Sequence, residues 1–401
     1  MDTDKLIDFK KSVEREKDNL LNFWIENAVD DENDGFYGEI SNEGKVNFTA
    51  DKSLILNTRI LWSFSNAYRK DKKEEYLEMA NRAASYLLNN FWDQEYGGFY
   101  WLLDYQGKVV KNKKQIYGQA FAIYAFSEYY RVTGAYNILT LLLDLFSLIE
   151  KYSNDKKYNG YFEACSRDWL SMPEDMSLSE KDMNVSKSMN THLHILEAYT
   201  NYYRVCSNEE LKDKLIGLIR VFLKYIIDNE KNCFRLFFDK DWKNICSGIV
   251  SYGHDIEGSW LLCEAAGVLG NKYLRGEVEK IALKMAEGVL RSGLMADGSI
   301  YYELNKGKLN KDRHWWVQAE AVVGFINAYQ LSGEEIYLNT ALNVWQHIIN
   351  NLVDKEYGEW YWLIDKQGRI SNEAKVNPWK SPYHNSRACY EIINRLDTIL
   401  L

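Results

Sequence analysis

The sequence predicts an all-α fold, an (α/α)6 barrel of twelve helices with short β-hairpins in the loops at one barrel end. Two observations lead to this prediction. A hairpin-like motif recurs six times at spacings of roughly 60 to 73 residues, which indicates an array of structural repeats. The intervals between the copies show helical periodicity, usually with two helices in each interval.

The hairpin motif is clearest in two segments that lie 261 positions apart. Residues 89–109 read NNFWDQEYGGFYWLLDYQGKV and residues 350–370 read NNLVDKEYGEWYWLIDKQGRI. Weaker copies occur near Asp34, Tyr158, Asn232 and Asp297. Each copy has a turn signal, alternating aromatic or aliphatic residues and a second turn, the pattern of a short β-hairpin.

Helices are expected over twelve segments that alternate with these hairpins and with short turns. The segments are residues 5–28, 52–70, 73–91, 113–133, 136–153, 183–206, 208–228, 252–270, 272–291, 311–332, 334–352 and 385–400. The three prolines, Pro173, Pro378 and Pro382, all fall in connections, so the helices can run uninterrupted. No linker interrupts the repeat, and we expect one catalytic domain over residues 1–401.

The order of the elements places the even-numbered helices inside the barrel and the odd-numbered helices outside. Every hairpin loop connects an outer helix to the next inner helix, so the hairpins gather at the end where the inner helices begin. A pocket there would combine the partial positive charge of helix N-termini with aromatic walls supplied by the hairpins.

Composition excludes several classes of protein. The net charge is −9 and there is no basic stripe, which argues against binding nucleic acid or an anionic membrane surface. The 13 Trp and 29 Tyr raise the aromatic share to 14%, and large flat rings suit the C–H faces of sugars. The alternative explanation of the high aromatic content is packing of these rings between helices.

The cysteines and the apolar segments indicate a cytoplasmic protein. Six cysteines form neither a CxxC pair nor a Cys/His metal pattern, which is typical of reduced thiols. The first residues, MDTDKLIDFKK, lack the apolar region of a signal peptide. The most apolar run, residues 138–149, is too short to span a bilayer and contains Asp144. We expect a monomer in the cytoplasm.

Three histidines carry the functional prediction: His194, His254 and His384 all fall in the first turns of even-numbered helices. We assign His192, His314 and His347 instead to packing or surface. Other polar and aromatic residues on the same inner faces are candidates for substrate binding, namely Arg59, Tyr117, Asn190, Glu257, Trp316, Glu320 and Trp379. Arg313 is expected to share a helix face with Trp316 and Glu320, and Trp315 is assigned to the core.

These residue types suit proton transfer on a sugar. Inverting a C–H centre beside a carbonyl needs one group to remove the proton and another, on the opposite face, to return it. Imidazole, with an unperturbed pKa of about 6.5, can do either, and His254 and His384 stand two places apart in a ring of six inner helices. Arg59 and His194 are candidate donors to an enediolate. Glu257 and Glu320 could orient imidazoles or form an inverting glycosidase pair.

Several long motifs resemble one family. They are TRILW around Arg59, EYGGFYW, QAFAIYA after Tyr117, MNTHLHILEAYT, SYGHDIEGSW, WWVQAEAVVGFINAYQ and PWKSPYHN. The chain resembles the N-acylglucosamine 2-epimerase superfamily nearly end to end, and WKSPYHN is most similar to the members that act on cellobiose. One position departs from the pattern, since Gly118 stands where the family usually has Asn, and this loss of a polar side chain near the cleft allows substrate preference to shift.

The resemblance implies an (α/α)6 barrel that interconverts glucose and mannose at the reducing end of β-1,4-linked disaccharides such as cellobiose and lactose. It implies proton transfer at C2 by His254 and His384 through a cis-enediolate after ring opening. It also implies that His194 and Arg59 act at O1 and O5 with help from Asn190 and Tyr117. By the same resemblance Glu257 and Glu320 hold hydroxyls and orient the bases, and Trp316 and Trp379 stack on the sugars.

The sequence is also compatible with other functions. An aldose–ketose isomerase, or an epimerase of the N-acylglucosamine or mannose type, would use the same scaffold. A glycoside hydrolase would need one carboxylate as acid and no pair of histidines, and a non-catalytic glycan-binding barrel would need no base. No metal cluster or phosphate-binding loop occurs in the sequence, so we expect no metal or nucleotide cofactor.

Overall fold

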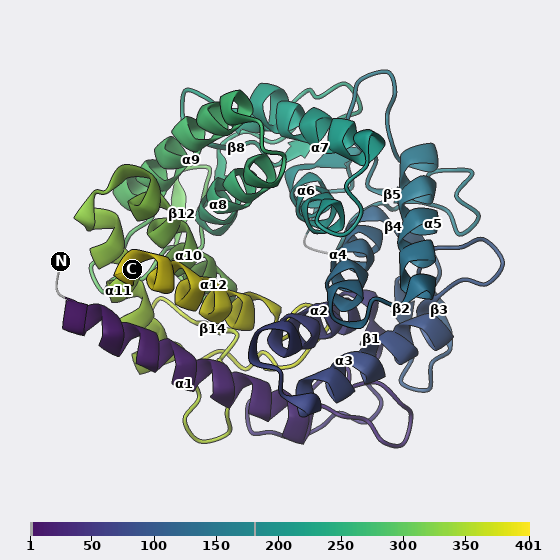
Figure 1. Ribbon diagram of the computed structural model, residues 1–401, viewed down its shortest axis with the longest axis horizontal. Coiled ribbons are helices and arrows are strands. Elements are labelled where there is room, and N and C mark those ends of the chain that lie inside the picture. The colour runs from purple at the N-terminus through teal and green to yellow at the C-terminus, as the bar shows by residue number, and fades with distance from the viewer. Residues whose placement is uncertain (1–2, 180–181) are drawn as a thin grey trace.

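The computed structural model describes residues 3–179 and 182–401 of the 401-residue chain. Six inner helices form a closed ring in which each packs on the next and the last returns to the first (Figure 1). They are α2 (Leu54–Asp71), α4 (Ile116–Thr133), α6 (Met189–Tyr203), α8 (Tyr252–Val268), α10 (Trp315–Ser332) and α12 (Tyr383–Leu400). The outer helices are α1 (Thr3–Asn27), α3 (Glu74–Tyr86), α5 (Tyr136–Tyr152), α7 (Glu209–Val221), α9 (Lys272–Ser292) and α11 (Glu335–His347). The predicted (α/α)6 barrel is therefore confirmed.

Hydrophobic patterning explains which helices lie inside. Helix α10 is buried almost all round, as expected of a helix enclosed by others. Helix α9 buries one stripe, which includes Leu274, Val278 and Met285, and turns its charged residues outward. Among the described residues, no helix is both long and apolar enough to cross a membrane.

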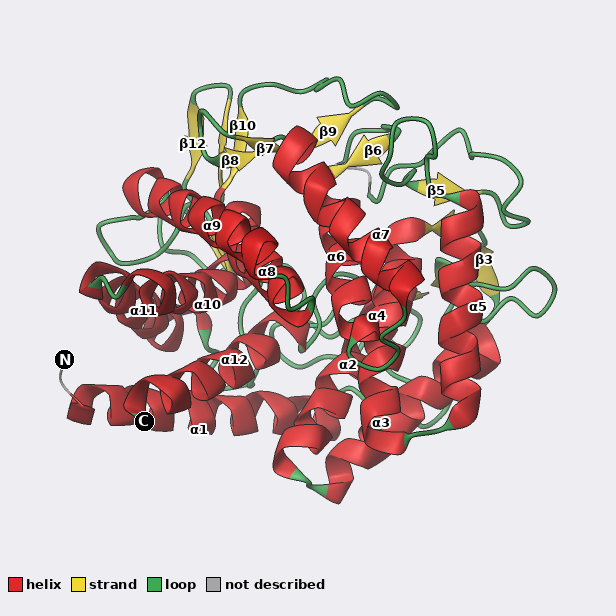
Figure 2. Cartoon of the chain, turned by 45° about the horizontal axis from the view of Figure 1, so that its top comes forward, coloured by secondary structure: helices red, strands yellow, loops and turns green. Residues whose placement is uncertain are grey.

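Short strands join the loops at one end of the ring (Figure 2). Strands β1, β4, β6, β10 and β13 each lead into an inner helix and pair with a strand of a later loop, and isolated bridges or β7–β8 close the predicted hairpins. The strands are β1 (Lys52–Ser53), β2 (Leu102–Leu103), β3 (Val109–Lys111), β4 (Lys114–Gln115), β5 (Ala164–Cys165), β6 (Lys187–Ser188), β7 (Ile227–Asp228), β8 (Cys233–Phe234), β9 (Phe237–Phe238), β10 (Ile249–Ser251), β11 (Glu303–Asn305), β12 (Lys308–Asn310), β13 (Arg313–His314) and β14 (Leu363–Ile364). A bridge between Ile40 and Val376 completes the circle.

Ion pairs fasten these hairpins to the inner helices. A turn aspartate accepts backbone N–H groups through one carboxylate oxygen and a lysine through the other. Asp93 does this with Lys114, which stands two residues before α4, at 2.9 Å. The same clasp recurs in Asp30–Lys52, Asp155–Lys187 and Asp354–Lys375. Each lysine is buried, so the hairpins are held firmly against the ring.

Several helix boundaries differ from the predictions. The segment 183–188 is not helical, because Ser188 caps α6 by accepting the N–H of Thr191. The segment 311–314 is also not helical, because β13 precedes α10. The last turns of three outer helices are π-helical, at η1 (Leu87–Phe91), η2 (Phe222–Ile226) and η3 (Ile348–Leu352).

Candidate active site

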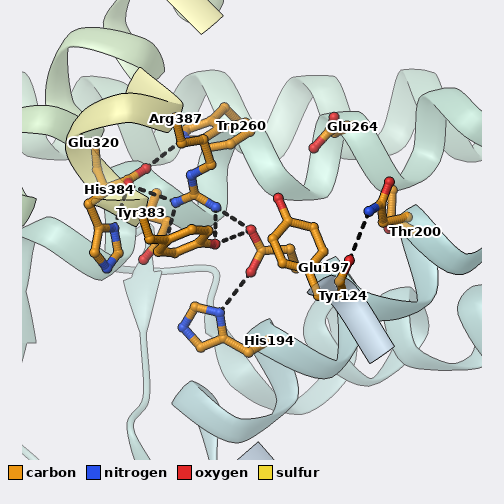
Figure 3. A network of polar contacts seen from close by, with 12 residues as sticks. Tyr124, His194, Glu197, Thr200, Trp260, Glu264, Glu320, Tyr383, His384 and Arg387 are labelled. Atoms are coloured by element: carbon orange, nitrogen blue, oxygen red, sulfur yellow. Dashed lines mark hydrogen bonds and ion pairs between the residues drawn. The ribbon is translucent and has the colours of Figure 1, made fainter. Parts of the chain in front are cut away.

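A buried arginine that the sequence reasoning missed lies at the centre of the barrel. Arg387 of α12 donates to Glu197 of α6 and Glu320 of α10 (Figure 3). It also donates to Glu257 of α8. Its distances to Glu257 and Glu320 are both 2.7 Å. The guanidinium also lies over the ring of Trp260 at 4.8 Å. One cation therefore holds three carboxylates from neighbouring helices in fixed positions.

Two of the predicted histidines stand at opposite ends of this network (Figure 3). The Nδ1 atom of His384 lies 2.7 Å from Glu320 Oε1, and Nδ1 of His194 lies 2.9 Å from Glu197 Oε2. Each carboxylate therefore fixes the orientation of one imidazole and engages its Nδ1. The Nε2 atom is left as the nitrogen available to a substrate.

The third histidine, His254, stands at the start of α8. Its Nδ1 lies 2.7 Å from the hydroxyl oxygen of Ser251, and its ring centroid lies 4.8 Å from that of Trp316. The Trp316 ring is also 5.8 Å from the His384 ring, so this indole lies beside both imidazoles. Gly253 makes the arrangement possible, because a Cβ atom there would meet the Trp316 ring at 2.5 Å.

Arg59 links the residues that form another wall of the site. It donates to the phenolic oxygen of Tyr117 at 3.0 Å and to the backbone carbonyl of Trp379 at 2.7 Å. The rings of Tyr117 and Trp379 are 6.0 Å apart, and Tyr117 meets the His194 imidazole edge-on at 4.9 Å. The structure thus brings Arg59, Tyr117, Trp379 and His194 together as one wall.

Asn190 faces a cavity that it shares with His254. Its Oδ1 atom is buried and has no hydrogen-bond partner among the described residues. Leu178, Leu236 and Phe237 give the cavity an apolar side. An acceptor such as Oδ1 is well placed for a hydroxyl group of a ligand.

Burial sets the protonation states of the histidines. Desolvation lowers the pKa of His254 to about 3, with the charge of His194 adding to the effect. Desolvation also lowers the pKa of His384 well below its usual value, helped by the positive charges of Arg59 and Arg387. Both imidazoles are therefore neutral at pH 7, the form in which they can accept a proton.

The three carboxylates respond differently to the same environment. Burial and the neighbouring charge of Glu320 raise the pKa of Glu257 to about 7. Burial raises the pKa of Glu320 as well, against the opposing charge of Arg387. For Glu197 burial is outweighed by Arg387 and by bonds from His194 and Tyr383, which lower its pKa to about 2. Glu197 is therefore ionised at pH 7.

One group of side chains has the composition of a metal site. Donor atoms of Glu257, Glu320 and His384 lie within 4.8 Å of one another. The guanidinium of Arg387 already supplies positive charge to both carboxylates, and His384 bonds Glu320 directly. The described contacts explain this cluster as an ion-pair network around an arginine.

The expected position of one residue on the inner face is wrong. Arg313 does not share a face with Trp316 and Glu320; it lies in β13 and bonds the Asp365 carbonyl at 2.5 Å and Asp297 at 3.1 Å. It takes the place of the clasp lysine in the fifth hairpin. Arg387 could have been found from its spacing, because it follows His384 by three positions and so shares its helix face.

Residues assigned to packing have structural partners. His192 accepts the backbone N–H of Tyr161 at 2.9 Å, and Trp315 is buried and lies against the Trp362 ring at 4.3 Å. His347 is buried in α11, an outer helix. Gly118 lies against Leu54 and Trp101, where a Cβ would come within 2.8 Å of Leu54, so the space expected for a polar side chain is filled by neighbours.

The chain is similar to known proteins over nearly its whole length. The model of the N-acylglucosamine 2-epimerase (GlcNAc 2-epimerase) family matches residues 35–388. A cellobiose 2-epimerase of Bacteroides fragilis is 47% identical over 93% of this chain and 95% of its own length, and one of Ruminococcus albus is 42% identical over 94% and 96%. The solved structure of cellobiose 2-epimerase from Bacillus thermoamylovorans superposes with a TM-score of 0.93 at 39% identity, covering 96% of this chain and 99% of that one. The chain is an epimerase and belongs to the N-acylglucosamine 2-epimerase family.

Proposed function

We propose that this chain inverts C2 of the reducing-end sugar of β-1,4-linked disaccharides, converting cellobiose to glucosyl-mannose and lactose to epilactose. The observation that carries the proposal is the pair of neutral imidazoles, His254 and His384, which both lie beside the Trp316 ring with their Nδ1 atoms engaged. The 47% and 42% identical relatives that act on cellobiose support the choice of substrate.

Ring opening comes first. His194 takes the proton from O1 and delivers it to O5 as the C1–O5 bond breaks and the C1 carbonyl forms, and Arg59, Asn190 and Tyr117 bind the two oxygens. One imidazole then removes the C2 proton through Nε2, and the electron pair moves to the carbonyl to give a cis-enediolate. The other imidazole takes up a proton from solvent and delivers it to the opposite face of C2, while the first imidazole releases the proton it removed to solvent.

The surrounding charges favour this intermediate. The imidazolium that forms at His384 is stabilised by Glu320, which lies 2.7 Å from its Nδ1. The guanidinium of Arg59 supplies a positive charge on the wall that also holds Tyr117 and His194. Trp316 and Trp379 offer flat, partly exposed rings on which sugar C–H faces can stack.

The carboxylate geometry does not favour an inverting glycoside hydrolase. Glu257 and Glu320 accept hydrogen bonds from the same nitrogen of Arg387, at 2.7 Å each. One carboxylate oxygen of each lies within 4.8 Å of the other. An inverting pair would be about 6.5–9.5 Å apart to admit a water molecule. Their engagement with Arg387 supports a role in orienting the bases.

Incubation of the purified protein with cellobiose in D2O, followed by NMR, tests the proposal. The expected product is glucosyl-mannose with deuterium at C2 of the reducing-end unit. A ketose-ended product would replace the proposal with an isomerase, and free glucose would replace it with a hydrolase. Unchanged cellobiose and lactose would reject the disaccharide assignment, and N-acylglucosamine and mannose would then be tried.

A further inference from the structure

The fourth residue of each of four inner helices binds the backbone of the hairpin that lies on it. In α6 it is His192, which accepts the N–H of Tyr161 at 2.9 Å and engages the Ser188 carbonyl with its other ring nitrogen. In α4 this residue is Gln119, whose amide accepts the N–H of Phe99 and donates to the C=O of the same residue, both at 2.8 Å. In α10 it is Gln318, which makes the same two bonds to Ile300, again at 2.8 Å. A carboxamide suits this position because it carries one acceptor and one donor.

Helix α8 has a carboxyl group at this position. Asp255 is its fourth residue, is 2% exposed, and accepts the N–H of Phe234 at 2.7 Å. Phe234 corresponds to Phe99 and Ile300, because the next residue, Arg235, donates to Ile226 as Tyr100 donates to Phe91. Both backbone groups of Phe234 therefore face away from the strand pairing and toward α8.

We infer that Asp255 is a protonated carboxylic acid that imitates a glutamine, accepting the Phe234 N–H with one oxygen and donating its proton to the Phe234 carbonyl with the other. A carboxylate could make only the first of these bonds, because it has no donor. Asp255 is then a positioning residue that locks the fourth hairpin to the helix carrying His254.

The surroundings of Asp255 favour the protonated form. Desolvation raises its pKa to about 8, and the Phe234 N–H opposes this only in part. The charge of Asp255 affects the pKa values of two titratable groups, Cys233 on the hairpin and Tyr252 on α8. Both groups are neutral at pH 7 because burial raises their pKa values. Neither supplies the positive charge that would stabilise a buried carboxylate.

Packing shows why this lock matters for α8. The Phe234 ring lies on Gly258, where a Cβ atom would meet it at 2.2 Å. In the fourth hairpin Asp228 also accepts turn N–H groups, but its ion pair within the described part of the chain is with Arg235, at 3.4 Å and partly exposed, in place of a buried lysine. The Asp255–Phe234 contact therefore contributes more to holding the start of α8 in place. This is where the Ser251 hydroxyl and His254 Nδ1 form their hydrogen bond.

Two variants separate the possibilities. Asp255→Asn keeps an acceptor and a donor at the same reach, whereas Asp255→Leu removes both. The infrared difference spectrum between wild type and Asp255→Asn at pH 6 should show the C=O stretch of one protonated carboxyl group. Thermal unfolding below about pH 4, where the side chain is protonated in the folded and unfolded states alike, should show that Asp255→Asn is close to wild type and that Asp255→Leu melts at a lower temperature.

The pH dependence gives a further readout. The folded state retains the Asp255 proton up to about pH 8, whereas the unfolded chain loses it near pH 4, so the folded state binds more protons in between. The Tm of wild type should therefore fall relative to Asp255→Asn as pH rises from about 4 to 8, and the difference should stay constant above that range. Gln318→Leu is the matched control, and its loss of Tm should not follow this titration.

Three outcomes would overturn the inference: a carboxylate band for Asp255 at pH 6, a Tm difference independent of pH, or equal destabilisation by Asn and Leu. The catalytic consequence rests on the proposed function: turnover should fall in Asp255→Leu and be retained in Asp255→Asn. If the infrared and melting results hold while no variant epimerises cellobiose, the lock stands and the proposed function fails.

Discussion

The imidazole of His384 and the carboxylate of Glu320 form a 2.7 Å hydrogen bond that joins α12 to α10. The same oxygen of Glu320 accepts a bond from Arg387, which continues through Glu197 to His194. Two imidazoles on opposite sides of the barrel are thus oriented by one continuous chain of charges. The position of each base depends on residues that do not touch the substrate.

Glu320→Gln should lower kcat by roughly 100-fold, because the neutral amide cannot stabilise the imidazolium that forms at His384. KM should change little. Steady-state kinetics with cellobiose would measure this. Glu128→Gln offers a control, because Glu128 is an equally buried carboxylate, paired with Arg69 and Arg131, outside the site. An unaltered kcat in Glu320→Gln would remove Glu320 from the account.

Arg387→Leu should destabilise the fold by about 3–5 kcal/mol, because it leaves the carboxylates of Glu197, Glu257 and Glu320 buried without their cation. Urea unfolding monitored by circular dichroism would give the free energy. A loss below about 1 kcal/mol, the size expected of a surface pair, would show that the network is not the buried ion cluster described here.

Trp379→Ala should raise KM with little effect on kcat, because stacking on a sugar ring stabilises the bound substrate and the transition state equally. The backbone carbonyl that Arg59 binds is retained in this variant. Initial rates over a range of cellobiose concentrations would separate the two parameters. A large fall in kcat at constant KM would contradict a stacking role.

Asp93→Asn should destabilise the protein at pH 7 by about 3–5 kcal/mol, because Lys114 would stay buried without its counter-charge. Bonds from Arg167 and Lys114 lower the pKa of Asp93 despite desolvation. Its contribution to stability is therefore present above about pH 4, the range in which the unfolded side chain is ionised, and disappears as pH falls through the folded pKa.

The unfolding free energies of wild type and Asp93→Asn should accordingly converge as the pH is lowered below about 4. Asp104→Asn provides the comparison, since Asp104 caps the other turn of the same hairpin through backbone N–H groups alone. A gap between wild type and Asp93→Asn that stays constant down to pH 2 would refute the clasp as an ionic interaction.

The ring of helices could be predicted because its signals are local. Periodicity and turn residues are read over short windows, and the recurrence of the hairpin gave the number of helix pairs. The faces of His194, His254 and Glu320 followed from spacing within single helices. Boundaries failed where a cap overrode periodicity, as at Ser188, which accepts the N–H of Thr191 and starts α6 there.

The charge network could not be predicted in the same way, because its members meet only in three dimensions. Arg387 is 190 residues from Glu197 and 130 from Glu257 in sequence. Spacing shows that Arg387 shares a face with His384, but not that three buried carboxylates converge on it. The expected position of Arg313 was wrong for a related reason. Residues 313–314 form strand β13 by pairing with a later loop, so α10 begins only after Arg313.

Solvent exchange in single-histidine variants tests the two-base account most directly. Glucosyl-glucose and glucosyl-mannose are incubated separately in D2O with His254→Asn and with His384→Asn, and deuterium at C2 is measured by NMR. If the two imidazoles serve opposite faces of C2, each variant should lose epimerisation yet still exchange the proton of one epimer, and the two variants should act on different epimers. Exchange of both epimers by one variant and of neither by the other would show that a single histidine performs both transfers, and would contradict the account.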